Sequence, residues 1–335
     1  MSRSIRRHRP PTAFPLALVG VLMIAVLGGC GLISSSGTLH SARLPNGKEP
    51  LHGASITVTS KAFTEQVILG KIAGTYLAAA GADVKDMTGA PGAASSRQAQ
   101  LRGETDVQWE YTGTGWVVYH ERTEAISDPT ELWEKVRDIE AKDNDLAWLP
   151  PSSLNNTYAF AASEETAKRT GVSTLSDVAA LPVDQRTFCI DDEFFSRSDG
   201  FLPMLKAYGI PFDSEEGVPQ RNVTRMDSGV IYTATAKGSP CNFGMVFSTD
   251  GRIPNLDLKV LEDDRKYFLP YSGSVVVRQS VLDAHPQIAD LMETISSRLN
   301  DDVMRELNGR VDIDGEDPGD VAFDWLVSEG LVKPD

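Results

Sequence analysis

Alternating and helically spaced apolar residues succeed one another along most of the chain. Residues 54–59 alternate as in a β-strand, and the run from 67 to 80, which ends at Gly81, has the spacing of a helix. The succession continues, because residues 91–101 predict a second helix and residues 106–109 a further strand. Strands that alternate with helices predict an α/β fold with a largely parallel sheet.

Further elements of both kinds are expected up to the carboxy terminus. They comprise helices at 131–143, 201–208, 230–236, 286–300 and 318–329, strands at 146–149, 155–162, 243–247 and 274–278, and a helix–strand unit at 166–190. A chain of 335 residues with this many elements fits two domains better than one.

The amino terminus predicts an exported protein. Arginines precede the apolar run Phe14–Leu27, which is too short to span a bilayer and indicates a cleaved signal peptide over residues 1–29. Leu27-Gly28-Gly29-Cys30 resembles the bacterial lipobox, which implies a lipid anchor at Cys30; a plain signal peptide with an incidental cysteine is the alternative. Residues 30–53 lack periodicity and predict a tether, so that order begins at Ala54.

The net charge excludes some classes of partner. It is −15 for the whole chain, and removal of residues 1–29, with four arginines and no acidic residue, makes it −19. A surface this acidic argues against nucleic acid and anionic lipid as partners. No stretch after the signal is long and apolar enough to cross a membrane, so membrane contact is expected through the anchor only.

Two cysteines remain after Cys30, and no catalytic or metal-binding pattern accompanies them. In an exported protein the isolated pair Cys189 and Cys241 indicates a disulfide. The histidines have no metal-ligand spacing, and the chain contains no Gly-x-Ser-x-Gly elbow. The sequence therefore predicts neither an enzyme nor a bound metal or cofactor.

The stretch Trp109–Trp116 combines three aromatic residues with two threonines and two glycines. Glycines let the backbone turn and approach a ligand closely, threonine hydroxyls donate hydrogen bonds, and Tyr111 offers a π-face with a polar edge. The combination suits a small ligand with a cationic or apolar end and an anionic end. The alternative is a strand and turn whose aromatic side chains fill a core.

Seven segments, in order across nearly the whole mature chain, resemble one known family. They are Ser60–Gln66, Glu110–Gly115, Asn155–Tyr158, Asp192–Phe194, Arg197–Gly200, Phe247–Arg252 and Leu261–Asp264. The family is that of the substrate-binding proteins of osmoprotectant ABC importers, which capture glycine betaine, choline, carnitine and related quaternary ammonium compounds.

The resemblance implies an α/β architecture of the type II periplasmic-binding-protein fold, with two α/β lobes joined by two crossover strands. Lobe 1 would comprise residues 54–156 and 267–335, and lobe 2 would be the inserted segment 157–266. Cys189 and Cys241 would then both lie in lobe 2.

The resemblance also implies an aromatic cage for a trimethylammonium group. Such a group has no N–H to donate, so aromatic faces hold it, each by about 0.5–2 kcal/mol of cation–π attraction. The matching positions are Tyr111, Tyr158, Phe247 and Tyr271, of which Phe247 replaces a family tyrosine and lacks its hydroxyl. Asn156 matches a position whose backbone carbonyl touches the methyl groups.

The carboxylate end of a betaine requires the opposite chemistry. Positions that hold it in the family match Lys61, Thr114 and Arg197, with Gln66 and Asp199 as weaker polar contacts. Because these residues come from both lobes, closure of the lobes on the ligand would assemble the site.

Together these features predict a monomeric, lipid-anchored, extracytoplasmic solute-binding protein that delivers a quaternary ammonium osmoprotectant to an ABC permease and its ATPase. A protein of the same fold that binds another small zwitterion or amino acid, or a surface sensor without transport, is the alternative. Tyr111→Ala is expected to weaken methylammonium binding at least about tenfold with little change in thermal stability.

Overall fold

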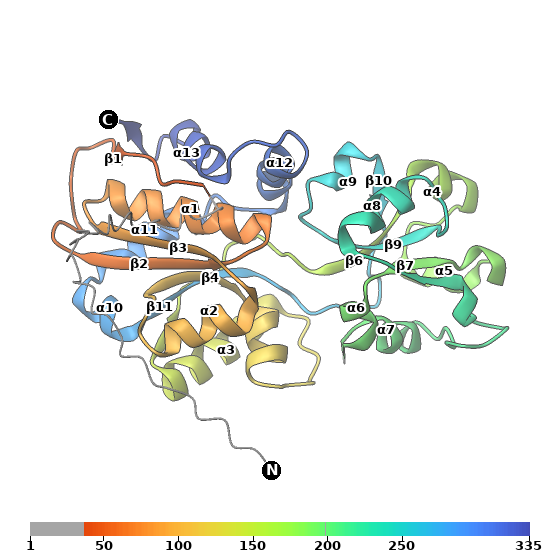
Figure 1. Cartoon of the computed structure of the whole chain (residues 1–335). Helices are drawn as coiled ribbons and strands as arrows, with labels where there is room; N and C mark the ends of the chain where they lie inside the picture. Colours follow the sequence, from red (N-terminus) through yellow and green to blue (C-terminus); the bar gives the residue numbers. More distant parts are fainter. Residues whose placement is uncertain (1–36, 198) are drawn as a thin grey trace, which may run out of the picture. The chain divides into compact units, whose positions relative to one another are not determined.

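The computed structural model describes residues 37–197 and 199–335 (Figure 1). The predicted signal peptide, residues 1–29, and the predicted lipidation site, Cys30, lie outside the described residues. Within the described ranges, none of the helices has the length and apolar character needed to cross a membrane.

The first sheet has five strands in the order β3-β2-β4-β11-β5. Their bounds are β2 Ser55–Lys61, β3 Asp83–Ala90, β4 Val107–Tyr111, β5 Leu146–Trp148 and β11 Gly273–Arg278. β2 runs parallel to β3 and β4, as the alternation of strands and helices predicts. β11 is antiparallel to β4 and β5, so the sheet is mixed, because β11 returns from the second sheet instead of following a helical crossover.

Helices cover both faces of this sheet. Their bounds are α1 Thr64–Ala79, α2 Gly92–Leu101, the π-helical segment η1 Thr114–Tyr119, α3 Pro129–Asn144, α10 Gln279–Ala284, α11 Gln287–Ser296, α12 Asp301–Asp312 and α13 Pro318–Ser328. Figure 1 shows α1 on one side of β2 and β3 and α2 on the other. Because α11, α12 and α13 also pack against α1, nearly all of its residues are buried, and it lacks a polar face.

The second sheet has the order β10-β6-β9-β7-β8. Its strands are β6 Tyr158–Ser163, β7 Phe188–Ile190, β8 Val223–Arg225, β9 Phe243–Phe247 and β10 Leu258–Val260. Its helices are α4 Glu164–Thr170, α5 Leu175–Ala180, α6 Asp192–Ser196, α7 Phe201–Ala207, α8 Ser228–Ala236 and α9 Arg252–Asn255, with 3-10 turns η2 Val183–Gln185 and η3 Gln220–Asn222. The predicted disulfide between Cys189, in β7, and Cys241, just before β9, is confirmed.

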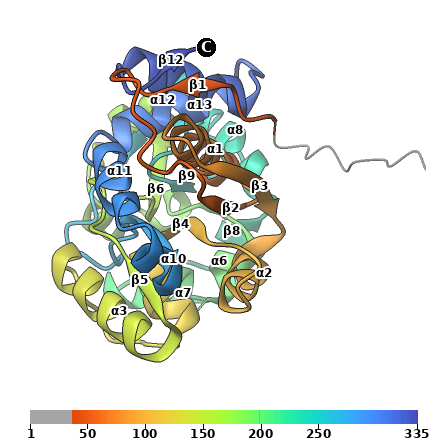
Figure 2. The same ribbon diagram turned by 90° about the vertical axis from the view of Figure 1, so that its left-hand side faces the viewer.

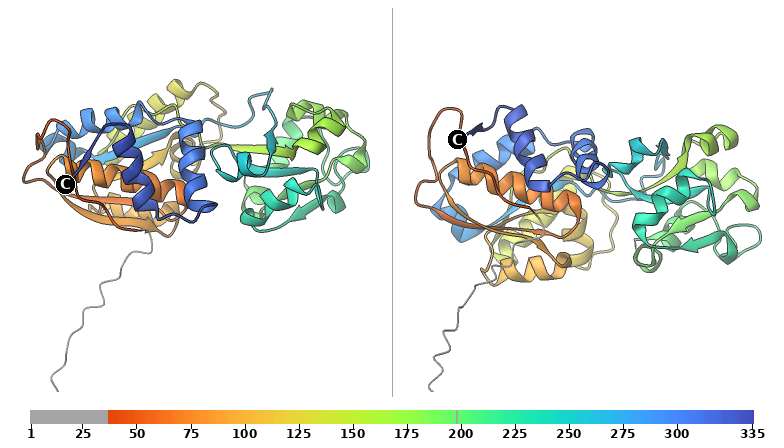
Figure 3. Two further views of the ribbon diagram at one scale, coloured as in Figure 1. Left: turned by 90° about the horizontal axis from the view of Figure 1, so that it is seen from above. Right: turned by 45° about the horizontal axis from the view of Figure 1, so that its top comes forward.

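Two segments, residues 149–157 and 261–272, connect the sheets (Figure 3). They are joined to each other by backbone pairing of Asn155 with Ser272. The Tyr271 N–H donates to Asn155 Oδ1 at 2.7 Å, and the Asn156 N–H donates to the Tyr271 carbonyl at 3.1 Å. The connecting segments therefore fix the positions of residues that the sequence selects for the ligand site.

Residues 37–53 also belong to the folded part of the chain, although the sequence predicts that order begins at Ala54. β1, Ala42–Arg43, pairs with β12, Lys333–Pro334, at the carboxy terminus (Figure 2). Leu51 is 1% exposed and packs in the core around the first sheet. The predicted tether is therefore wrong for residues 37–53. Their few apolar residues have no regular spacing, and contacts with distant elements hold them.

Candidate functional site

Tyr111 and Tyr271 lie at the edge of the first sheet, where β4 ends next to the second connecting segment. The Thr112 N–H donates to the Ser272 carbonyl at 3.1 Å and fixes this junction. A Cβ atom at Gly113 would lie 2.7 Å from the ring of Tyr271. Gly113 therefore allows that ring to lie directly on the backbone that leads into η1.

Three of the four predicted cage residues form one aromatic cluster. Tyr158 and Phe247 are paired across β6 and β9, and their ring centroids are 5.2 Å apart. Tyr271 meets Tyr158 edge-on at 6.2 Å. Phe194, which the sequence analysis did not select, lies 4.7 Å from Tyr158 and is fully buried, so it supports this ring from within the core.

Tyr111, the fourth predicted cage residue, lies apart from this cluster and is 3% exposed. Its ring stacks on Phe63 at 6.3 Å, and the Lys61 ammonium lies 4.7 Å from its centroid. Its hydroxyl donates to Glu65 Oε1 at 2.6 Å. Burial, followed by the charge of Glu65, raises the pKa of this phenol well above its ordinary value.

Glu65, in the first turn of α1, connects parts of the chain that are distant in sequence. Its Oε1 also accepts from Asn156 Nδ2 at 3.0 Å, and its Oε2 accepts from Asn308 Nδ2 at 3.1 Å. Burial raises the pKa of this carboxyl, against the opposite effect of hydrogen bonds from Thr249, Tyr111 and the two asparagines. Glu65 thus joins α1, β4, the first connecting segment, α12 and the loop after β9.

Lys61, at the end of β2, is already paired inside the protein. Its ammonium donates to the carboxylate of Glu110, and both side chains are buried. The hydroxyl of Tyr119 donates to the same carboxylate. The ammonium predicted to hold a ligand carboxylate is therefore neutralised by an internal one.

A second buried ion pair lies close to Tyr119, whose ring is 4.3 Å from the guanidinium of Arg97. Arg97 donates two hydrogen bonds of 2.6 and 2.7 Å to Glu140, and His120 Nε2 lies 2.7 Å from the same carboxylate. Although burial opposes ionisation, His120 and Arg97 lower the pKa of Glu140. Among the described residues no cluster of histidine, cysteine and carboxylate side chains could hold a metal ion.

Arg197 is likewise paired with an internal carboxylate. Its Nε and Nη2 donate to the two carboxylate oxygens of Asp199, each at 2.8 Å. Nη2 also donates to the Tyr271 hydroxyl at 3.1 Å, and the guanidinium lies 5.4 Å from the centroid of Tyr158. The structure therefore brings Arg197, Asp199, Tyr158 and Tyr271 together.

The remaining predicted residues, Gln66, Asn156 and Thr114, lie near Tyr111 in the fold. Gln66 is fully buried in α1, and neither atom of its amide has a hydrogen-bond partner among the described residues. Asn156 binds Glu65 through its nitrogen, and its amide oxygen is also unpartnered in the part of the chain that the structure describes. Thr114 is largely buried at the start of η1.

The sequence analysis missed Asn308 because it did not predict α12. A signal was present: Asn300 caps this helix by accepting from the Val303 N–H, and acidic residues occupy its first turn. The helix predicted at 286–300 ends at Asn300, the residue that caps α12. Asn308 and Arg305 also donate to backbone carbonyls of the loop after β9, at 2.9 and 2.8 Å, so α12 holds that loop.

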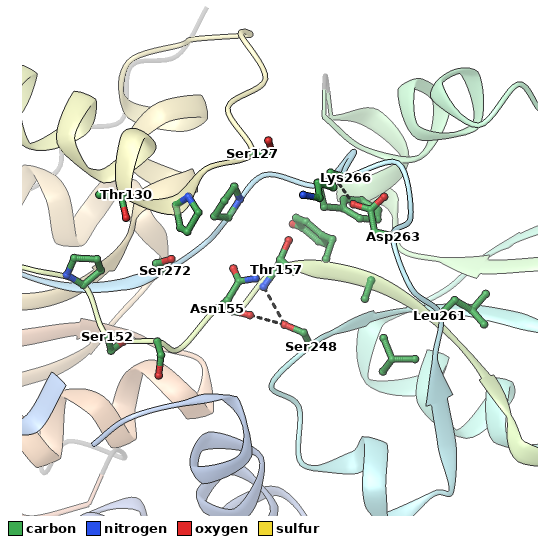
Figure 4. Close-up of a pocket in the computed structure, with 18 residues that line it drawn as sticks. Ser127, Thr130, Ser152, Asn155, Thr157, Ser248, Leu261, Asp263, Lys266 and Ser272 are labelled. Atoms are coloured by element: carbon green, nitrogen blue, oxygen red, sulfur yellow. Dashed lines mark hydrogen bonds between the residues drawn. The ribbon is translucent and has the colours of Figure 1, made fainter. Parts of the chain in front are cut away.

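A cavity of about 740 Å³ lies beside the connecting segments (Figure 4). Asn155, Thr157 and Ser248 line it, and Figure 4 shows the hydrogen bonds by which Ser248 joins the other two. Tyr158 is the one predicted ligand residue in its lining. Its walls are mainly serine, threonine and proline side chains, so it does not correspond to the predicted aromatic cage.

Most of the folded part of the chain is similar to known solute-binding proteins. The family described as the substrate-binding domain of ABC-type glycine betaine transport systems matches residues 54–328. A glycine-betaine-binding protein of Pseudomonas aeruginosa is 38% identical over 286 residues, which cover 83% of this chain and 89% of that protein. The ergothioneine transport permease/binding protein EgtU of Helicobacter pylori is 32% identical over 279 residues, which cover 82% of this chain and 48% of that protein.

The structural comparison gives the same result. A crystal structure described as a glycine betaine/carnitine/choline ABC transporter matches with a TM-score of 0.74 at 25% identity, over 82% of this chain and 99% of that chain. The predicted α/β fold of periplasmic solute-binding proteins and the family resemblance are thereby confirmed. Members of this family are extracytoplasmic substrate-binding components of transporters and not enzymes. The chain belongs to the family of substrate-binding domains of ABC-type glycine betaine transport systems.

Proposed function

We propose that this protein captures a quaternary ammonium compound of the glycine betaine, choline or carnitine type and delivers it to an ABC permease and its ATPase. Family membership and the ligands for which the relatives are named support this role. The observation that carries the proposal is the cluster of Tyr158, Phe247 and Tyr271, whose rings meet although they come from β6, β9 and the second connecting segment.

This cluster has the chemistry that a trimethylammonium group requires. Each exposed aromatic face can contribute about 0.5–2 kcal/mol to cation binding. The Tyr158 face already lies 5.4 Å from the guanidinium of Arg197, which supports its capacity to hold a cation. In the proposed complex the backbone carbonyl of Asn156 contacts the methyl groups, and Tyr111 completes the cage when the lobes close.

The polar end of the ligand is assigned to groups next to the cage. Thr114 and the amide of Gln66, which has no hydrogen-bond partner among the described residues, offer neutral hydrogen bonds. Lys61 and Arg197 offer positive charge to a carboxylate, in exchange for their present partners Glu110 and Asp199.

The proposed lobes are residues 54–156 with 267–335, and the inserted segment 157–266. Each contains one of the two sheets, and the assigned ligand residues divide between them. We further propose a monomer anchored by a lipid on Cys30. Cys30→Ser should move the protein from the membrane fraction to the soluble fraction, and an unchanged distribution would contradict the anchor.

Isothermal titration calorimetry of the mature protein tests the function. Glycine betaine, choline, carnitine and ergothioneine, all of which carry a trimethylammonium group, are compared with L-proline and other amino acids. At least one trimethylammonium compound should bind, and Tyr158→Ala should weaken it at least about tenfold. Phe323→Ala, which removes a ring of α13 that stacks on His40, is the matched control. Binding of an amino acid and of no trimethylammonium compound would refute the proposal.

A further inference from the structure

Every cationic side chain assigned to the ligand site is neutralised by an internal carboxylate. Lys61 is buried against Glu110, which has no exposed surface. Arg197 binds Asp199 through two parallel hydrogen bonds, the geometry in which a guanidinium holds a carboxylate most strongly. The recognition groups for a ligand carboxylate are thus occupied.

Glu65 is the carboxyl group of the site that has no cationic partner among the described residues. Among the described residues its hydrogen-bond donors are Tyr111, Asn156, Asn308 and Thr249, all neutral, and none of the ion pairs of the described residues includes it. These donors favour the ionised carboxylate, and burial, the largest effect on this group, opposes them and raises its pKa. Two of these donors belong to the proposed site: Tyr111, a proposed cage wall, and Asn156, the proposed methyl contact.

With Glu65 ionised, the site carries two positive and three negative side chains, from Lys61, Arg197, Glu110, Asp199 and Glu65. We infer that the site, if it binds quaternary ammonium compounds as proposed above, selects ligands with a net positive charge, quaternary ammonium alcohols such as choline, over zwitterionic betaines. A buried negative charge attracts a cation strongly because little solvent screens it.

A ligand carboxylate meets a further cost in this arrangement. To reach Arg197 it must displace Asp199, and to reach Lys61 it must displace Glu110, which in each case leaves an internal carboxylate without its partner. The hydroxyl of a quaternary ammonium alcohol needs no such exchange. It can hydrogen-bond to Thr114 or to the amide of Gln66, which has no partner among the described residues.

Calorimetric titration of the wild-type mature protein with choline and with glycine betaine at neutral pH tests the inference. Choline should bind at least about tenfold more tightly. Glu65→Gln should reduce this ratio by weakening choline more than glycine betaine. Glu104→Gln, which removes one negative charge from an exposed pair with Arg102, should leave the ratio unchanged.

A second variant, Asp199→Asn, tests the inference without changing the hydrogen bonds of Glu65. It removes the negative charge that is paired with the Arg197 guanidinium and should tighten glycine betaine relative to choline. Equal or tighter binding of glycine betaine by the wild type, or an unchanged ratio in a folded Asp199→Asn protein, would overturn the inference alone. Absence of binding of every trimethylammonium compound would overturn the proposed function and the inference with it.

Discussion

The hydrogen bond between Tyr111 and Glu65 gives the sharpest test of how the site is built. Tyr111→Phe keeps the ring and its packing and deletes one hydrogen bond of 2.6 Å to a buried carboxylate. Hydrogen bonds to charged groups contribute about 1.5–3 kcal/mol. Because Glu65 keeps its bonds to Asn156, Asn308 and Thr249, the loss should lie near 1.5–2 kcal/mol.

The assay is equilibrium unfolding of the ligand-free protein, by denaturant and by heat. For a protein of this size the loss corresponds to a fall of roughly 2–3 °C in Tm. Tyr267→Phe is the control, because its hydroxyl lies 3.4 Å from the Gly200 carbonyl and should contribute within about 0.5 kcal/mol of zero. A Tyr111→Phe protein as stable as wild type would refute the importance of this bond.

The burial of Tyr111 also changes the expectation for Tyr111→Ala. The sequence predicts little change in stability, as for a residue on an open binding surface. At 3% exposure, truncation of the ring should cost about 3–5 kcal/mol and would also weaken the hold on Glu65. Loss of ligand affinity in this variant therefore cannot be separated from loss of structure, and Tyr111→Phe is the more informative substitution.

Three further outcomes follow from the structure. Joint replacement of Cys189 and Cys241 by serine should cost roughly 4 kcal/mol in denaturant titration, because the bridge closes a separation of 52 residues, and equal unfolding midpoints would contradict this. Gly251→Ala should destabilise the protein by more than about 1 kcal/mol, because the new Cβ would lie 2.2 Å from the Gly309 nitrogen, whereas Gly309→Ala meets nothing closer than 3.6 Å and should be tolerated. Equal thermal melts of the two alanine variants would refute that contact. The lowered pKa of Glu140 means that its ion pair stabilises the fold above about pH 4.5 and loses this contribution as pH falls through its folded-state pKa. Glu140→Gln should therefore unfold more easily at pH 7 and show a shallower acid dependence, and a parallel pH profile would contradict this.

Much of the fold follows from local patterns in the sequence. The strand and helix periods place β2, α1, β4 and β11 close to their observed bounds, and the cysteine pair predicts the observed disulfide. The aromatic residues at 158, 247 and 271 are identified by the resemblance to the family, and they meet in the structure. Local patterns suffice here because strand and helix periods depend on residues a few positions apart.

The sequence does not show which charges are already paired. Lys61 and Arg197 were selected to bind a ligand carboxylate, yet each holds an internal carboxylate in the folded chain. The folded segment 37–53 and α12 are missed for a related reason, because contacts with distant elements hold both of them in place.

Glu65 shows the same limit most clearly. As a residue in the motif Ser60–Gln66 it marks the family, and nothing beside it in the sequence indicates its partners. These partners lie 46, 91 and 243 residues away, at Tyr111, Asn156 and Asn308. The sequence alone determined the family, most of the elements and the aromatic side chains. Only the tertiary structure decided the charge balance around them, because burial and hydrogen bonding between distant segments determine which carboxylate has no cationic partner among the described residues.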